Sequence, residues 1–311
     1  METLWYYKCI IIKLKVSLWK RELIVLADFD NNEYKLGSKS FTVVAINTAA
    51  TAGEWIKSKL GTFKNLDLKY SPHDLVTEVD KGSETLIRNL IMTHFPQHSF
   101  LGEEGVEPGP AASAAALANV SDAEYLWIVD PIDGTTNYVH GFPFFVVSIA
   151  LAYKGEVIVG VVYDPSRDEL FVAEKGKGAY VKGKRMSVSP ENKLSDSLIG
   201  SGFPADRNYA LPINQKGIQA IAPKVRNIRA LGSAALQLAY VAAGRLSGFW
   251  EIGLNSWDIA AGALLIQEAG GTVSDTLGKP YTLDVRNVMA TNGSIHQELQ
   301  EELAQCDGTG F

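Results

Sequence analysis

Three apolar segments joined by short connections constrain the fold of this 311-residue chain more than any other feature. They span residues 144–153, 156–163 and 169–174, and their side chains alternate between apolar and polar. Lys154-Gly155 separates the first two, and Asp164 to Arg167 separates the last two. Such short connections place successive strands side by side in opposite directions. The middle of the chain therefore predicts an antiparallel meander.

The remaining periodicity predicts a mixture of helices and strands, that is, an α+β or α/β protein. Pro and Gly frame an Ala-rich stretch at 106–122, which we expect to be a surface excursion. We expect helices at 41–59, 81–94, 233–243, 257–269 and 294–305, and further strands at 98–101, 125–129, 225–229, 247–251, 272–275 and 288–291.

The segment W-I-V-D-P-I-D-G-T-T-N at 127–137 carries the strongest chemical signal. An apolar strand runs into Asp130, and we expect Pro131 to end it because proline lacks an N–H group. Asp133 then adds a second carboxylate, and Gly134 and Thr135 follow with backbone N–H groups. Carboxylates bind Mg²⁺, and N–H groups at a turn bind phosphate, so the segment indicates metal-assisted phosphoryl chemistry. An Asp-rich turn would explain the segment alone equally well.

Two further acidic segments favour the chemical interpretation. F-L-G-E-E-G at 100–105 ends an apolar run in Glu103 and Glu104. S-W-D-I-A-A-G-A-L-L-I-Q-E-A-G-G at 256–271 is typical of a helix with Asp258 in its first turn, where an acid also stabilises the helix dipole.

Composition excludes several classes of protein. The net charge of −6 gives no basic footprint for nucleic acid, so we expect no DNA partner. Two cysteines, Cys9 and Cys306, suit a reducing cytoplasm better than a disulfide scaffold. The apolar run Cys9 to Trp19 is short and contains Lys13 and Lys15, so we expect neither a membrane span nor a signal peptide. Its alternation is typical of a strand.

Four motifs in one order resemble the inositol monophosphatase family, Mg²⁺-dependent and lithium-sensitive phosphatases of sugar phosphates, in particular its bacterial-type members. These motifs are D-L-V-T-E-V-D at 74–80, G-E-E-G at 102–105, D-P-I-D-G-T-T-N at 130–137 and W-D-I-A-A-G at 257–262. The resemblance implies a layered αβαβα sandwich with two mixed, largely antiparallel sheets, like that of fructose-1,6-bisphosphatase. It covers a catalytic domain at 41–311, which leaves residues 1–40 as an N-terminal extension of unknown role.

The resemblance also implies a site for two or three Mg²⁺ ions. One ion would be held by Glu103, Asp130 and the carbonyl of Ile132, and a second by Asp130, Asp133 and Asp258. A third would contact Glu103 through water. Thr135, hydrogen-bonded to Asp80, would orient the attacking water, although Asp80 can also serve as a helix cap.

Substrate contacts follow from the same resemblance. The phosphate would lie against the N–H groups of Gly134 and Thr135, and the hydroxyl groups would meet Asp133, Glu251 and the turn Gly232-Ser233-Ala234. A surface glutamate at a strand end is the plainer interpretation of Glu251. Lys69 matches a family position near the metal-site loop, and a solvated lysine explains it as well.

The implied reaction is hydrolysis of myo-inositol 1-phosphate, or of a related polyol or sugar phosphate, by a homodimer. Fructose-1,6-bisphosphatase and histidinol-phosphate phosphatase are the alternatives within the fold. A different class is a binding partner of the transcription machinery. The complete set of acids favours an enzyme, because a pure binding protein has no physical need for them.

Overall fold

The computed structural model describes residues 40–61, 66–68 and 75–310. By its contacts the chain divides into two units, one of Met1–Ser38 with Lys182–Lys184 and the other of Lys39–Val181 with Arg185–Phe311. The account below concerns the second unit. The strand expected within residues 9–19, and Lys69, lie outside the described residues.

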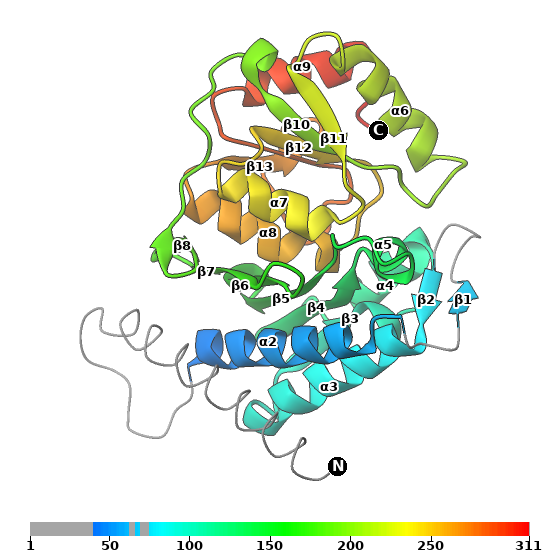
Figure 1. Ribbon diagram of the computed structural model, residues 1–311, viewed down its shortest axis with the longest axis vertical. Coiled ribbons are helices and arrows are strands. Elements are labelled where there is room, and N and C mark those ends of the chain that lie inside the picture. Colours follow the sequence, from blue (N-terminus) through cyan, green and yellow to red (C-terminus); the bar gives the residue numbers. More distant parts are fainter. Residues whose placement is uncertain (1–39, 62–65, 69–74, 311) are drawn as a thin grey trace. The chain divides into compact units, whose positions relative to one another are not determined.

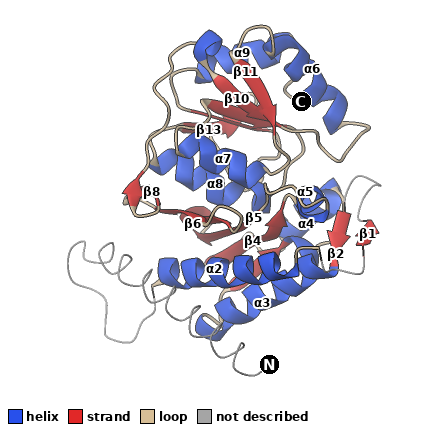
Figure 2. Cartoon of the chain, viewed as in Figure 1, coloured by secondary structure: helices blue, strands red, loops and turns tan. Residues whose placement is uncertain are grey.

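A large sheet contains the expected meander (Figures 1 and 2). Its first two strands are parallel, and each later neighbour as far as β8 is antiparallel. The strands lie in chain order: β3 (Ser99–Gly102), β4 (Tyr125–Asp133), β5 (Val146–Tyr153), β6 (Glu156–Asp164), β7 (Glu169–Glu174) and β8 (Gly178–Val181), and β9 (Lys184–Arg185) comes next in the chain. The predicted meander is confirmed.

A second sheet has the order β11-β10-β12-β14-β13. Strand β10 is parallel to both of its neighbours, and the pairs that involve β14 are antiparallel. The strands are β10 (Leu198–Ser201), β11 (Asn227–Ala230), β12 (Gly248–Glu251), β13 (Thr272–Asp275) and β14 (Val288–Thr291). Strands β1 (Leu66–Leu68) and β2 (Leu75–Thr77) form a separate antiparallel pair.

Helices cover both sheets, so the unit has five layers (Figure 1). Helices α2 (Phe41–Lys59) and α3 (Glu78–His94) cover the outer face of the large sheet. Helices α7 (Ala234–Ala242) and α8 (Ser256–Glu268) lie between the sheets and are mostly buried. Helices α6 (Ala210–Ile221) and α9 (His296–Gln305) cover the second sheet. The expected αβαβα sandwich is thus confirmed.

Strand β4 corrects one expectation. Pro131 does not end the strand, which continues to Asp133. The pairing with β5 shifts between Asp130, opposite Ser148, and Asp133, opposite Val146. A bulge accommodates a residue that cannot donate a ladder hydrogen bond, so the strand passes through the proline.

The sequence also left several elements unassigned. The 106–122 segment is largely at the surface, and it contains helix α4 (Pro110–Ala118), which begins with proline at its first position. Helix α6, strand β10 and the short helices α5 (Thr135–Val139), η1 (Glu103–Gly105) and η2 (Leu194–Asp196) were not expected. Within the described residues, no helix is long and apolar enough to cross a bilayer.

Candidate active site

The register of β3 and β4 brings two acids to one edge of the large sheet. Gly102 pairs with Val129, so the next residues along the parallel strands, Glu103 and Asp130, are neighbours. The charge of Glu103 is among the causes that raise the pKa of Asp130 above its usual range. The parallel strands β3 and β4 therefore place two acids side by side at their carboxyl ends, each after an apolar stretch.

Helix α8 adds a further acid, Asp258, from the layer between the sheets. Carboxylate oxygens of Asp130, Asp133 and Asp258 lie within 4.8 Å of one another. Asp130 and Asp133 are buried, and Asp258 is half-buried. Residues more than a hundred positions apart in the chain thus form one acidic cluster.

Asp258 is oriented by the start of its own helix. It is the third residue of α8, and its Oδ2 accepts a hydrogen bond from the backbone N–H of Asn255 at 2.7 Å. The side chain thereby satisfies one of the free N–H groups at the helix start. Capping and membership of the acidic cluster are therefore compatible in this residue.

Asp80 occupies the same position in helix α3. Its Oδ2 accepts hydrogen bonds from the N–H of Thr77 at 2.8 Å and from the Thr77 hydroxyl at 2.6 Å. Its other oxygen lies 3.0 Å from the hydroxyl of Thr135, which donates to it. The same hydroxyl also lies 3.0 Å from the carbonyl of Ile132. Asp80 is therefore a helix cap and a partner of Thr135 at once.

Asp133 connects the large sheet to helix α7. Its Oδ2 accepts hydrogen bonds from the Ser233 hydroxyl and from the N–H of Ala235, both at 2.6 Å. Its Oδ1 accepts from the N–H of Ala234 at 3.3 Å. A negative side chain at this helix start is favoured by the free N–H groups and the helix dipole. The turn expected to contact substrate therefore lies directly beside the acidic cluster.

The protein environment makes this cluster hard to ionise. Burial first, and then the charges of Glu103, Asp133 and Asp258, raise the pKa of Asp130 well above its usual range. Burial raises the pKa of Asp133 to about 6, against the opposing hydrogen bonds from Ser233 and the α7 backbone. The pKa of Asp258 is also well above its usual range because of burial and nearby acids. A positive charge beside these crowded carboxyl groups would lower their pKa values and stabilise their ionised forms.

Glu251 stands at the end of β12, beside this cluster. It is buried, and burial together with the charges of Asp258 and Asp133 raises its pKa to about 8. Gly202 makes room for its carboxylate, since a Cβ at position 202 would lie 2.1 Å from Glu251 Oε2. The buried position rules out the interpretation of Glu251 as a solvated surface glutamate.

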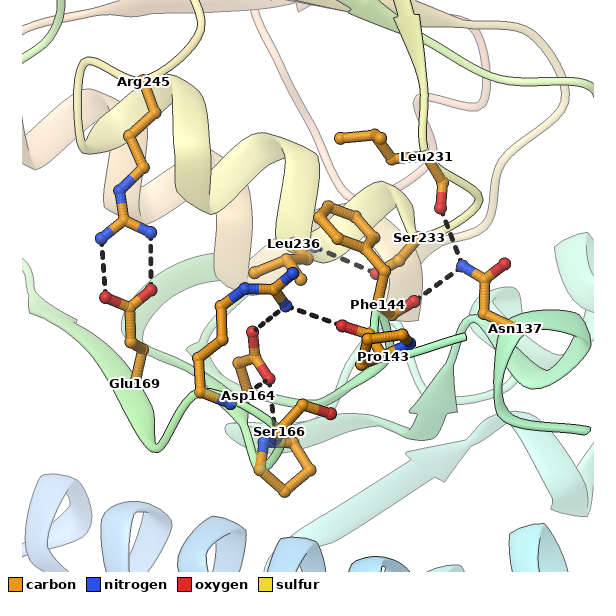
Figure 3. Close-up of polar contacts among 12 residues, drawn as sticks. Asn137, Pro143, Phe144, Asp164, Ser166, Glu169, Leu231, Ser233, Leu236 and Arg245 are labelled. Atoms are coloured by element: carbon orange, nitrogen blue, oxygen red, sulfur yellow. Dashed lines mark hydrogen bonds and ion pairs between the residues drawn. The ribbon is translucent and has the colours of Figure 1, made fainter. Parts of the chain in front are cut away.

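Asn137 and Gly134 lie where two turns meet. One is the turn at Gly134 and Thr135, expected to contact phosphate, and the other is the turn at 232–234, expected to contact the substrate hydroxyl groups. The Asn137 amide donates to the carbonyls of Phe144 and Leu231, each at 2.7 Å (Figure 3). Gly134 has φ of 100°, and a Cβ there would lie 2.9 Å from the carbonyl oxygen of Phe144. From the sequence alone neither Asn137 nor Gly202 has a separate role. The only signal for Asn137 was its place at the end of the D-P-I-D-G-T-T-N motif.

The donor atoms of the cluster fit a hard divalent cation. They are carboxylate oxygens from strand β4 and helix α8, they are close together, and burial first and then mutual repulsion raise their pKa values. Mg²⁺ takes oxygen ligands, and a buried carboxylate group of this kind is stabilised by such an ion. The site is therefore suited to bind metal.

Comparisons with known proteins agree with this geometry. Residues 38–307 match the model of the inositol monophosphatase family. The inositol-1-monophosphatase of Mesorhizobium japonicum is 41% identical over 82% of this chain and 93% of its own length. The Nus factor SuhB of Pseudomonas aeruginosa is 40% identical over 82% of this chain and 93% of its own. The crystal structure of the extragenic suppressor protein suhB from Bartonella henselae has a TM-score of 0.75 and 38% identity, with 84% of this chain and 97% of that chain covered.

The five-layered sandwich, with acids gathered at the ends of β3 and β4 and the start of α8, is that of a phosphatase. The chain belongs to the inositol monophosphatase family.

Proposed function

We propose that this phosphatase hydrolyses myo-inositol 1-phosphate, or a related polyol phosphate, to the free polyol and phosphate with the help of Mg²⁺. The observation that carries the proposal is the buried cluster of Asp130, Asp133 and Asp258, whose oxygens lie within 4.8 Å of one another. The catalytic domain would be residues 41–311, in line with the family match at 38–307, with residues 1–40 as an extension.

The proposed metal ligands are the acids of the cluster together with Glu103 and the carbonyl of Ile132, for two or three ions. When bound, Mg²⁺ lowers the pKa of a water and neutralises charge on the leaving oxygen. The protein's own part is to hold these oxygens in place and to exclude bulk water from a buried site.

Thr135 and Asp80 are proposed to orient the attacking water. The Thr135 hydroxyl donates a hydrogen bond to Asp80 at 3.0 Å, so the lone pairs of its oxygen are available to accept a hydrogen bond from water. Asp80 is held in place by the two hydrogen bonds from Thr77. A fixed acceptor of this kind aligns the water for in-line attack. As the new P–O bond forms and the bond to the leaving oxygen breaks, the proton of the water would pass to Thr135 while the proton of Thr135 passes to Asp80.

The substrate is proposed to lie between two turns. Its phosphate would accept hydrogen bonds from the N–H groups of Gly134 and Thr135, and its hydroxyl groups would meet Glu251, Asp133 and the turn Gly232-Ser233-Ala234. The two carboxyl oxygens of Glu251 can accept hydrogen bonds from hydroxyl groups. A buried acceptor that needs such donors favours a polyol over a simple phosphate ester.

A phosphate-release assay tests the proposal. Turnover should require Mg²⁺ and stop in excess chelator, and Ca²⁺ should inhibit because it is larger and tolerates irregular coordination. Inositol 1-phosphate should be preferred over fructose 1,6-bisphosphate and histidinol phosphate. Undiminished turnover in metal-free buffer would contradict the metal assignment. A preference for either of the other substrates would replace the inositol assignment.

A second candidate function is binding to the transcription machinery, since a relative at 40% identity is named a Nus factor. Binding of purified RNA polymerase by the chain and by its Asp130→Asn variant tests it. Equal binding by both would establish a role separate from catalysis. The resemblance also leads us to propose a cytoplasmic homodimer, and light scattering in solution would measure the dimer.

A further inference from the structure

Helix α3 contains a second buried acid one helical turn after Asp80. Glu84 is 6% exposed, and its Oε2 accepts a hydrogen bond from the backbone N–H of Glu104 at 2.7 Å. On the other side, its Oε1 lies 3.7 Å from the guanidinium of Arg88. Burial raises the pKa of Glu84 above its usual range. The mechanism proposed above gives this carboxyl group no role.

The turn that Glu84 holds is η1, which carries Glu103. Gly102, immediately before that turn, lies against the same carboxylate. A Cβ at position 102 would lie 2.3 Å from Glu84 Oε2. Only glycine leaves room for the Glu84 carboxylate beneath the turn. Packing therefore explains why glycine occupies the first position of the G-E-E-G motif.

The same helix contacts the other parts of the site. Residues four apart share one face of a helix, so Asp80 and Glu84 both face the large sheet. Asp80 contacts Thr135, and the buried Ser83 between them donates to the carbonyl of Pro131 at 3.4 Å. One rigid helix therefore touches the end of β4, helix α5 and turn η1.

We propose that Glu84 is a positioning residue that fixes η1 so that the Glu103 carboxylate faces the acidic cluster of Asp130, Asp133 and Asp258. This inference rests on the proposed function, because it assigns Glu103 to the ions. Partners of metal ligands orient the ligands, and their loss typically weakens metal affinity by about 10- to 100-fold.

Mn²⁺ binding followed by electron paramagnetic resonance tests the inference directly, beside the Mg²⁺ dependence of turnover. Glu84→Ala removes the acceptor, whereas Glu84→Gln keeps an oxygen at the same reach. We expect the Mn²⁺ Kd of Glu84→Ala to rise by about 10- to 100-fold. Glu84→Gln should recover most of this affinity, because an amide oxygen also accepts the N–H of Glu104.

The matched control is Glu268→Ala. Glu268 accepts hydrogen bonds from the N–H groups of Gly176 and Gly178, both at 2.7 Å, so it is also a helix carboxylate that holds a turn. It lies near the far end of α8, about 15 Å along the helix from Asp258. We expect this variant to lose thermal stability and to keep the wild-type Mn²⁺ Kd.

An unchanged Mn²⁺ Kd in Glu84→Ala would overturn the inference, as would an equal loss in Glu268→Ala. If Glu84→Ala fails to fold, Gly102→Ala takes its place, because the added methyl group displaces the same carboxylate and should weaken Mn²⁺ binding in the same way. Normal Mn²⁺ binding by Gly102→Ala would then refute the inference.

The wild type and Glu103→Gln separate the proposed function from the proposed positioning role of Glu84. If the wild type does not bind Mn²⁺, the proposed function fails. If Glu103→Gln weakens binding and Glu84→Ala does not, only the positioning role fails.

Discussion

The hydroxyl of Thr135 lies 3.0 Å from Asp80, and both residues stand in the first turn of a helix. The two helices come from different parts of the chain and meet beside the acidic cluster. Substitution of Thr135 is consequently the most direct test of the proposed orientation of the attacking water.

Thr135→Ala should lower kcat by about 10²- to 10⁴-fold, because the positioned proton acceptor is lost. Thr135→Ser keeps the hydroxyl and should retain most of the activity. Steady-state kinetics on inositol 1-phosphate measures both. The melting temperature should move little in either variant, since the bonds from Thr77 still hold Asp80. Equal activity in the Ala and Ser variants would remove Thr135 from the mechanism.

Asp130→Asn should reduce turnover by at least about 100-fold, because several kcal/mol of charge stabilisation depend on the ions. Without metal the same variant should melt at a higher temperature than the wild type, since it relieves repulsion among buried acids. Added Mg²⁺ should stabilise the wild type and have much less effect on the variant. Thermal melts with and without Mg²⁺ check this, and equal stabilisation of both proteins would argue against a shared ion site.

Glu251→Gln should change substrate preference more than metal requirement. Replacement of one of the two carboxyl oxygens by an NH2 group, which cannot accept a hydrogen bond, should weaken transition-state binding of a polyol phosphate by about 1–3 kcal/mol. A phosphate ester without these hydroxyl groups should be hydrolysed nearly as before. The ratio of kcat/KM for the two substrates is the measurement. A uniform loss, or a higher Mg²⁺ requirement, would instead place Glu251 in the metal site or the scaffold.

The stability of metal-free protein should also depend on Glu251 in a pH-dependent way. Its pKa rises from 4.5 to about 8 in the folded state, so folded protein keeps a proton that unfolded protein releases. The resulting stabilisation is complete below pH 4.5 and is lost as pH rises through 8. Relative to Glu251→Gln, which stays neutral, the wild type should lose stability across this interval. Parallel melting curves at each pH would contradict it.

Gln237→Met should stabilise the protein. Gln237 is fully buried in α7, and neither atom of its amide has a hydrogen-bond partner in the described part of the chain. Methionine has nearly the same shape and no such polar group, so we expect a gain of about 1 kcal/mol, or roughly 2–4 °C in Tm. Gln267→Met, at an exposed position of α8, is the control and should change Tm little. A fall in Tm for Gln237→Met would show that the amide is satisfied in solution.

Periodicity and turn spacing were enough to predict the meander and most helices, because these signals are local. Helix 41–59 and strands 169–174, 272–275 and 288–291 agree residue for residue with the structure. Pro131 misled the prediction because its tolerance depends on a bulge that only the pairing with β5 reveals. Helix α6 was missed since Pro212 and Gly217 weaken the helical signal.

The acids of the candidate site stand in motifs that are visible in the sequence, but their surroundings could not be predicted from it. Burial of Glu251, and the space that Gly202 provides for it, depend on strands β10 and β12 lying in one sheet. The hydrogen bond from the Asn137 side chain to the Leu231 carbonyl joins residues 94 positions apart. The link between Glu84 and η1 likewise depends on how α3 packs, which no local pattern encodes.

Asp80 and Asp258 share one device: each is the third residue of its helix and bonds back to the N–H that precedes the helix, at 2.8 and 2.7 Å. Each carboxylate is thus aimed by a segment of only four residues. A designer who transplants these two acids to another scaffold would need to copy two helix beginnings rather than a network of distant contacts. Homologous sequences could accordingly diverge widely in their β-sheets while the side chains of Asp80 and Asp258 keep the same orientation.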